Sequence, residues 1–320
     1  MVRDTLYFMR AILIIAYRRA DALTQILESC HNSGIKNIFI HIDGPKDSSA
    51  GPDVEKVRVA AQNFAKSISL NIQLCIQREN LGCAVSLVTA LDTVFGSVDE
   101  LIVLEDDCIP GADFWKFADQ SFEIMKTDPS IGLFCGPQFG PKNLLSSDWF
   151  LSSYPFHWGW GVNSRRWFEI RAELCSPAVL RRSAKDSMSE SRYWNAGCQR
   201  ALNGRTDVWD TLFVRQMRRL GLKALLPPEN LIRNLGNDRI ALHTSENSIW
   251  TNYKIGNYQI QNIKPKLNSS FEDWARNEYF GISPRHLLST RITSVRDRFK
   301  RKKYQNSLKE RLNHASAIFL

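Results

Sequence analysis

The stretch LIVLEDDCIP places three acidic residues directly after an apolar run, and this feature constrains the chain most. Such a run fills a buried strand of a parallel α/β sheet, and the polar residues at its C-terminal end face the ligand crevice. Glu105, Asp106 and Asp107 would repel one another there unless a cation lay among them. Oxygen ligands suit a hard divalent ion such as Mg2+ or Mn2+, which often binds together with substrate phosphates. The motif therefore predicts a site for a metal-bound nucleotide diphosphate; the alternative is three solvated acids at a strand end.

The first 135 residues alternate between short apolar strands and amphipathic helices, which is the pattern of a doubly wound α/β sheet. We expect strands near residues 11–17 and at NIFIHI, NIQLCIQ, LIVLE and IGLFCG. Right-handed crossovers place the ends of such strands on one edge of the sheet. Polar residues that follow different strands are therefore expected to share one crevice, namely Arg19, Asp43, Arg78, Asn80 and Asp107.

The second half of the chain has a different pattern. It contains an aromatic and glycine-rich stretch, FHWGWGVNSRRW, followed by helical segments that include TDVWDTLFVRQMRRLG, a short strand and a polar loop, NLGNDRIALHT. From about residue 265 the pattern weakens into a basic tail. We therefore predict one domain over residues 1–264, with a nucleotide-binding half (1–135) and a catalytic half (136–264), and a helical tail over 265–320.

These motifs occur in an order that resembles a known family. The order is Asp43-Gly44, the strand-end acids, the Trp-Gly-Trp-Gly loop, Trp209-Asp210 and a late His243. In this order the chain resembles the nucleotide-sugar-dependent glycosyltransferases of the GT-A fold over roughly residues 8–245. More narrowly, it is similar to bacterial relatives of the N-acetylglucosaminyltransferase I family. The resemblance implies a GT-A type, Rossmann-like, doubly wound mixed sheet with a helical, basic C-terminal extension.

The resemblance also implies roles for single residues. Asp107 resembles the metal ligand, and His243 resembles the histidine that completes the metal or diphosphate site. Planar aromatic rings suit the apolar faces of sugars, and glycines let the backbone approach a ligand closely. Contacts to the sugar or the acceptor are expected from Trp158, Trp160 and Gly161, with core packing as the alternative for the two tryptophans. Contacts to the nucleotide-sugar donor are expected from Arg19, Asp43, Arg78, Asn80, Glu105 and Asp106.

Asp210 is the candidate general base. Inverting sugar transfer needs a carboxylate that takes the proton from the acceptor hydroxyl as this hydroxyl attacks the anomeric carbon. The family often has two acids after this tryptophan, whereas Thr211 follows Asp210 here. Asp207 is therefore a possible substitute, and a plain helix-start acid is the alternative interpretation of Asp210.

The predicted function is thus metal-dependent, inverting transfer of a sugar from a nucleotide diphosphate sugar, a UDP-sugar in the first place, to a glycan or lipid-linked acceptor. One rival is a sugar nucleotidyltransferase, but AILIIAYRRAD lacks the glycine-rich basic loop of those enzymes. Another is a non-enzymatic nucleic-acid-binding protein that uses the basic tail. Because the positive charge is confined to the last 40 residues and the aromatic residues concentrate elsewhere, we expect no nucleic-acid partner.

Composition adds an expected location. The apolar runs are far shorter than the roughly 20 residues of a membrane span, and no secretory signal pattern opens the sequence, so we expect a cytoplasmic protein. Seven cysteines are scattered without a CxxC pair, which favours small buried hydrophobic residues over disulfides or zinc ligands.

The tail carries most of the net charge. Residues 281–320 hold ten Lys and Arg against two acids, and therefore +8 of the formal net charge of +9. Apolar residues of this segment fall near one helical face (Ile292, Val295, Phe299, Leu308 and Leu312), between clusters of basic residues. This pattern predicts peripheral attachment to an anionic membrane surface, on the inner face of the membrane; a basic helix packed on the domain or a disordered end is the alternative.

Overall fold

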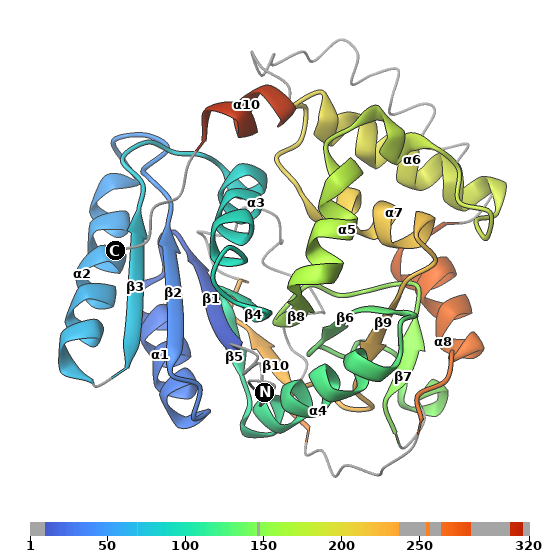
Figure 1. Cartoon of the computed structure of the whole chain (residues 1–320), viewed down its shortest axis with the longest axis horizontal. Helices are drawn as coiled ribbons and strands as arrows, with labels where there is room; N and C mark the ends of the chain where they lie inside the picture. Colours follow the sequence, from blue (N-terminus) through green and yellow to red (C-terminus); the bar gives the residue numbers. More distant parts are fainter. Residues whose placement is uncertain are drawn as a thin grey trace, which may run out of the picture.

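The fold is seen in a computed structural model of the chain (Figure 1). The structure describes residues 10–68, 70–145, 148–236, 254–256, 264–282 and 308–315.

Four parallel strands form one half of the central sheet. They are β1 (Arg10–Ala16), β2 (Asn37–Ile42), β3 (Asn71–Ile76) and β4 (Glu100–Glu105), in the order β3-β2-β1-β4. Crossover helices connect them, namely α1 (Ala20–Asn32), α2 (Gly51–Ser67) and α3 (Cys83–Val94). The strands are apolar because helices cover both faces of a parallel sheet, and β1 and β4 are almost fully buried. This half agrees with the alternation expected from the sequence.

The second half of the sheet is mixed. Strand β8 (Trp160–Asn163) pairs antiparallel with both β4 and β6 (Ile131–Cys135). Strand β9 (Lys223–Leu226) then pairs parallel with β6, and β7 (Phe150–Ser152) closes the edge. A separate ribbon pairs β5 (Cys108–Pro110) with β10 (Ile232–Asn234) directly after the three acids. The predicted α/β class with a mixed, Rossmann-like sheet is confirmed.

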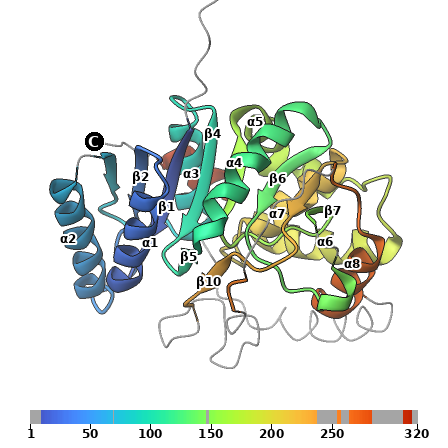
Figure 2. The same cartoon turned by 90° about the horizontal axis from the view of Figure 1, so that it is seen from below.

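Helices pack on the two faces of the sheet in two apolar clusters (Figures 1 and 2). One cluster joins α1, α2 and α4 (Ala112–Thr127) to the sheet. The other contains α3, α5 (Ser164–Leu174), α6 (Met188–Leu202) and α7 (Asp210–Arg219). Short 3-10 turns occur at Lys142–Leu144 and Pro177–Leu180. The N-terminal ends of α3 and α7 lie close together, because Asp207, just before α7, accepts hydrogen bonds from the first residues of α3.

The described C-terminal segments pack against the second cluster, and the predicted division into a domain over residues 1–264 and a tail over 265–320 stays a prediction. Helix α8 (Ser269–Trp274) and the π-helical turn η4 (Ala275–Tyr279) begin next to β7, where Leu267 bridges Leu151, and Phe271 and Ala275 are fully buried. Helix α10 (Leu308–His314) buries Leu308 and packs Leu312 against the same cluster. Two residues of the predicted membrane-facing surface therefore face the protein, while Ile292, Val295 and Phe299 lie outside the described residues. The predicted boundary between the two halves of the domain stays a prediction.

The seven cysteines are free thiols, six of them buried and Cys83 half-buried. Their predicted role as small packing residues is therefore confirmed. Among the described residues, no helix has the length and apolar character to cross a membrane.

Strand β2 carries a fully buried histidine, His41, and burial lowers the pKa of this histidine from 6.5 to about 4. The unfolded chain takes up a proton as the pH falls through 6.5, whereas the folded chain does not until about pH 4. The stability that neutral His41 contributes is thus complete above pH 6.5 and is lost as the pH falls.

We predict that acidification from pH 7 to pH 5 lowers the free energy of unfolding by about 2 kcal/mol through His41. Denaturant unfolding of the wild type and of His41→Leu at both pH values measures this contribution. The loss of stability on acidification should be smaller in the variant by that amount. Equal losses in both proteins would contradict the assignment.

Candidate functional site

The three acids lie where β4 ends. Glu105 is the last residue of β4 and is in register with Ile15 of β1, while Asp106 and Asp107 form the turn into β5. The apolar strand ends here because the chain must leave the buried sheet, and β5 then pairs with β10. The sequence therefore predicts correctly that these acids lie at the C-terminal edge of the parallel strands.

Asp106 holds the loop between β1 and α1. One of its oxygens accepts hydrogen bonds from the backbone N–H groups of Tyr17 (2.8 Å) and Arg18 (3.1 Å). Its other oxygen accepts a hydrogen bond from the Arg19 guanidinium (3.1 Å). The side chain is almost completely buried, so Asp106 anchors the loop that carries Arg19. Its predicted contact with the donor stays a prediction.

Asp107 has a different environment. Its Oδ1 accepts a hydrogen bond from the Asn234 amide of β10 at 3.3 Å, and its Oδ2 lies 3.7 Å from the Arg19 guanidinium. The side chain keeps 18% of its surface exposed. Burial, followed by repulsion from Asp106, raises the pKa of Asp107 above its ordinary value. A carboxylate that is destabilised in this way gains when a cation binds beside it.

Glu105 shows the same strain more strongly. Burial, followed by the charges of Asp107, Asp106 and Asp210, raises its pKa from 4.5 to about 8, and Arg19 opposes the shift. The influence of Asp210 places that residue on the same side of the molecule as the acids, although it lies 105 positions later in the chain. The predicted catalytic role of Asp210 stays a prediction.

Asp210 is the first residue of α7 and is exposed. Its Oδ1 accepts a hydrogen bond from the Thr211 N–H of its own first turn at 2.6 Å, as is usual for an acid at a helix N-terminus. The helix is fixed behind it by a buried ionic network in which Arg218 binds Asp186 and Glu190 of the neighbouring segments. Asp210 is therefore an exposed carboxylate on a rigid support.

Asp207, the alternative candidate for the base, caps a neighbouring helix. Its two oxygens accept hydrogen bonds from the N–H groups of Cys83 (2.9 Å) and Ala84 (3.2 Å) at the start of α3. Helix α3 has no cap from its own N-cap residue, Gly82, so Asp207 supplies the missing acceptor. This distant cap could not be read from the sequence, because the acceptor and the helix are more than a hundred residues apart.

Asp43 closes the same helix end from the other side. Its oxygens accept hydrogen bonds from the N–H groups of Leu81 (2.7 Å) and Gly82 (2.9 Å), and from the Asn80 amide (3.0 Å). Burial raises the pKa of Asp43, and the backbone hydrogen bonds from Leu81 and Gly82 oppose the shift. Two carboxylates thus occupy the N–H groups of residues 81–84, so an anion is not expected at this helix end.

The remaining donor candidates lie around Asp43. Asn80 also donates to the Gly44 carbonyl (2.8 Å), which joins the loops after β2 and β3. Arg78 is exposed in the loop after β3. The structure therefore brings Asn80 and Asp43 together and leaves Arg78 at the rim; donor contacts by all three stay predictions.

The aromatic loop requires a correction. Trp160 is fully buried and stacks on Trp209 with ring centroids 5.3 Å apart, so it cannot contact a sugar. A Cβ at Gly161 would collide with the Phe134 ring, so this glycine is required by packing and not by a ligand. Trp158 is half-buried against Phe139 and remains a candidate contact. Alternating residues of a strand face opposite sides of the sheet. Because both faces of β8 are buried, neither set of its side chains reaches a ligand.

The metal site is described only in part. His243 lies outside the described residues. In the part of the chain that the structure describes, no three His, Cys, Asp or Glu side chains converge as a metal-binding group. The hard oxygen donors of Asp107 and Glu105, with pKa values raised by burial and by neighbouring carboxylates, fit a divalent cation in chemistry.

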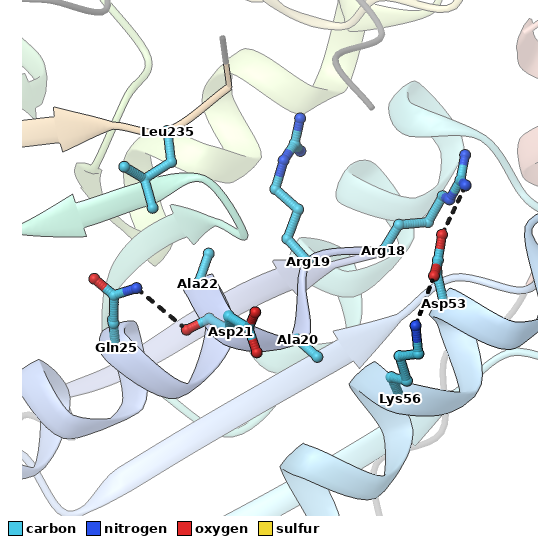
Figure 3. Close-up of a pocket in the computed structure, with 9 residues that line it drawn as sticks. All are labelled: Arg18, Arg19, Ala20, Asp21, Ala22, Gln25, Asp53, Lys56 and Leu235. Carbon is cyan, nitrogen blue, oxygen red and sulfur yellow. Dashed lines mark hydrogen bonds and ion pairs between the residues drawn. The ribbon is translucent and has the colours of Figure 1, made fainter. Parts of the chain in front are cut away.

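A pocket of about 320 Å³ opens beside the acids at the start of α1 (Figure 3). Arg18 reaches across it to Asp53 of α2 (2.8 Å), which Lys56 also approaches (3.3 Å). The wall is completed by Arg19, Ala20, Asp21, Ala22, Gln25 and Leu235. Arg19 lines the pocket and also contacts Asp106 and Asp107, so it links the pocket to the acids.

Comparison with known proteins gives only distant matches. No protein-family model and no curated protein matches the chain. Among solved structures, a mannosyltransferase from Pyrobaculum calidifontis, bound to GDP-Man and Mn2+, is similar with a TM-score of 0.41 and 13% identity, over 68% of this chain and 70% of that one. Glucosyl-3-phosphoglycerate synthase from Mycobacterium tuberculosis, bound to Mn2+, UDP and glucosyl-3-phosphoglycerate, gives 0.34 and 11% over 49% and 57%. Function must therefore be argued from the side chains.

The clamp on α3 predicts the effect of a conservative change at Asp43. In Asp43→Asn the amide NH2 must face a backbone N–H group, because both carboxylate oxygens accept such bonds. We expect a loss of about 1–3 kcal/mol in the free energy of unfolding, measured with denaturant. Glu79→Gln, in the exposed loop nearby, is the matched control and should stay near the wild type. Equal stability of both variants would show that Asp43 is not an anchor.

Proposed function

We propose that the chain is a metal-dependent, inverting glycosyltransferase that moves a sugar from a nucleotide diphosphate sugar to a glycan or lipid-linked acceptor. A UDP-sugar is the donor that we favour. The observation that carries the proposal is the group of destabilised carboxylates at the end of β4, with the exposed Asp210 on the same side. Kinship with the N-acetylglucosaminyltransferase I family is part of the proposal and rests on the order of the sequence motifs.

Asp107 is the residue that would hold the metal, with His243 as the predicted second ligand. Its carboxylate is partly exposed, and its raised pKa means that a bound cation relieves an unfavourable charge. A bound Mn2+ or Mg2+ would act as a Lewis acid on the leaving diphosphate. Asp106 then acts indirectly, because it orients the backbone at Tyr17 and Arg18 and the guanidinium of Arg19.

The pocket at the start of α1 supports binding of an anionic donor. Three basic residues, Arg18, Arg19 and Lys56, outnumber the two acids of its wall, Asp21 and Asp53. A guanidinium pairs well with phosphate and also stacks on a nucleotide base. Arg19 joins the pocket to the acids, so a donor held by the arginines would have its diphosphate beside Asp107.

Asp210 would take the proton from the acceptor hydroxyl. An exposed carboxylate at a helix start can meet an incoming hydroxyl, and the Arg218 network anchors the other end of the same helix. Trp158 is the aromatic residue that would contact a sugar ring, because it keeps part of its surface exposed. Attachment to an anionic membrane now rests on residues 292–303, and a cytoplasmic location stays a prediction.

The metal assignment predicts that Asp107→Asn abolishes Mn2+-dependent turnover and leaves the fold intact, because the change removes one charge without altering side-chain volume. Turnover is measured as nucleotide diphosphate release from UDP-sugars across a Mn2+ series. Glu28→Gln, an exposed change on α1, serves as the control with the same loss of charge. Full activity of Asp107→Asn at low Mn2+ would refute the assignment.

The base assignment predicts that Asp210→Asn slows transfer by roughly 100-fold or more and leaves donor affinity nearly unchanged. Asp207→Asn should behave differently, because it weakens the cap of α3 and therefore lowers the melting temperature. Transfer rate, donor affinity and melting temperature are measured for both variants. If Asp207→Asn were the inactive variant at unchanged stability, the base would be Asp207.

A further inference from the structure

Helix α10 lies above α3 and beside α6 in Figure 1, and Arg311 brings it next to the start of α3, which Asp43 and Asp207 close. Leu308 is buried and Leu312 packs against the same apolar cluster, so the helix has a fixed orientation. That orientation points Arg311 at the start of α3. The sequence prediction of a membrane-facing helix gave no reason to expect this contact.

Arg311 joins two segments that are far apart in the sequence. Its guanidinium donates a hydrogen bond to the Leu81 carbonyl (2.6 Å) and lies 3.4 Å from an Asp207 oxygen. Both charged side chains are only about one-fifth exposed, at 21% and 22%, so water screens the pair incompletely. A planar guanidinium suits this position because it can reach a carbonyl and a carboxylate at the same time.

Asp207 connects this contact to the candidate base. The Asp207 carboxylate, which contacts Arg311, also accepts hydrogen bonds from the N–H groups of Cys83 and Ala84. Asp207 lies three residues before Asp210. Asp207 is therefore held between α3 and α10. Without Arg311, Asp207 would keep its hydrogen bonds to α3 but lose its contact with the C-terminal helix.

We propose that Arg311 is a positioning residue for Asp210, acting through Asp207; the inference rests on the proposed glycosyltransferase function. Arg311 does not touch a substrate in this account. It fixes the direction from which the Asp210 carboxylate meets the acceptor, and a small displacement of such a group can cost up to about 100-fold in rate. The C-terminal helix is then a part of the catalytic domain.

Three full-length variants test the proposal. Arg311→Met removes the charge and keeps the approximate length of the side chain, and Arg311→Lys keeps the charge without the planar guanidinium. Lys309→Met is the matched control on the exposed face of α10. We expect Arg311→Met to lower kcat for transfer by about 10-fold or more while donor affinity stays within about twofold. Arg311→Lys should recover part of kcat, and Lys309→Met should match the wild type.

The double variant Arg311→Met, Asp210→Asn shows whether the effect passes through the base. It should be no slower than Asp210→Asn alone, because residues that act through one group are not additive. Additive losses, or a fall in donor affinity and melting temperature that accounts for the lost rate, would overturn the positioning role.

Hydrogen exchange gives a readout that does not depend on transfer. In Arg311→Met, amides of residues 81–84 and 205–212 should exchange faster than in Lys309→Met, by about fivefold or more. Unchanged exchange in these segments would overturn the proposal even for an active enzyme. Faster exchange together with a wild-type chain that transfers no sugar would instead refute the proposed function and keep the structural link.

Discussion

Repulsion among carboxylates at the C-terminal edge of the parallel strands is the constraint on which the rest of the site depends. The carboxylates that repel one another are Glu105, Asp106, Asp107 and Asp210, and Asp43 and Asp207 lie nearby at the start of α3. Such a cluster is stable only when hydrogen bonds, cations or protonation compensate the charge. The surrounding structure supplies the first two: backbone N–H groups from several loops, Arg19 from the β1–α1 loop, and Arg311 from the C-terminal helix.

The compensation divides the acids into two groups. Asp43, Asp106 and Asp207 each accept hydrogen bonds from backbone N–H groups of another segment, so they hold loops in place. Neighbouring carboxylates as well as burial raise the pKa values of Glu105 and Asp107, whereas burial alone raises the pKa of Asp43, so the charge of Glu105 and Asp107 is less well compensated. Asp210 is exposed on its helix. The chemistry that we propose uses the second group, and the first group gives it a rigid frame.

The parallel strands and the position of the acids could be predicted from the sequence, because apolar runs and strand order place strand ends at one edge. The roles of Trp160 and Gly161 could not, because a strand with both faces buried has the same composition as a loop that contacts a sugar. The cap from Asp207 and the contact of Arg311 were also missed. Both join residues more than a hundred positions apart, and no local pattern marks such pairs. The basic composition of the tail suggested attachment to a membrane surface. It therefore did not predict that Leu308 and Leu312 pack against the apolar cluster of the domain.

The central claim is that the strand-end acids bind a divalent metal together with a nucleotide diphosphate. Thermal unfolding of the full chain with UDP alone, Mn2+ alone and both together tests it most directly, because a ligand that binds only the folded state raises the melting temperature. The account predicts a rise with both that exceeds the sum of the separate rises and is lost in Asp107→Asn. Additive or absent shifts with UDP, and likewise with GDP, would contradict a joint metal–nucleotide site at the end of β4.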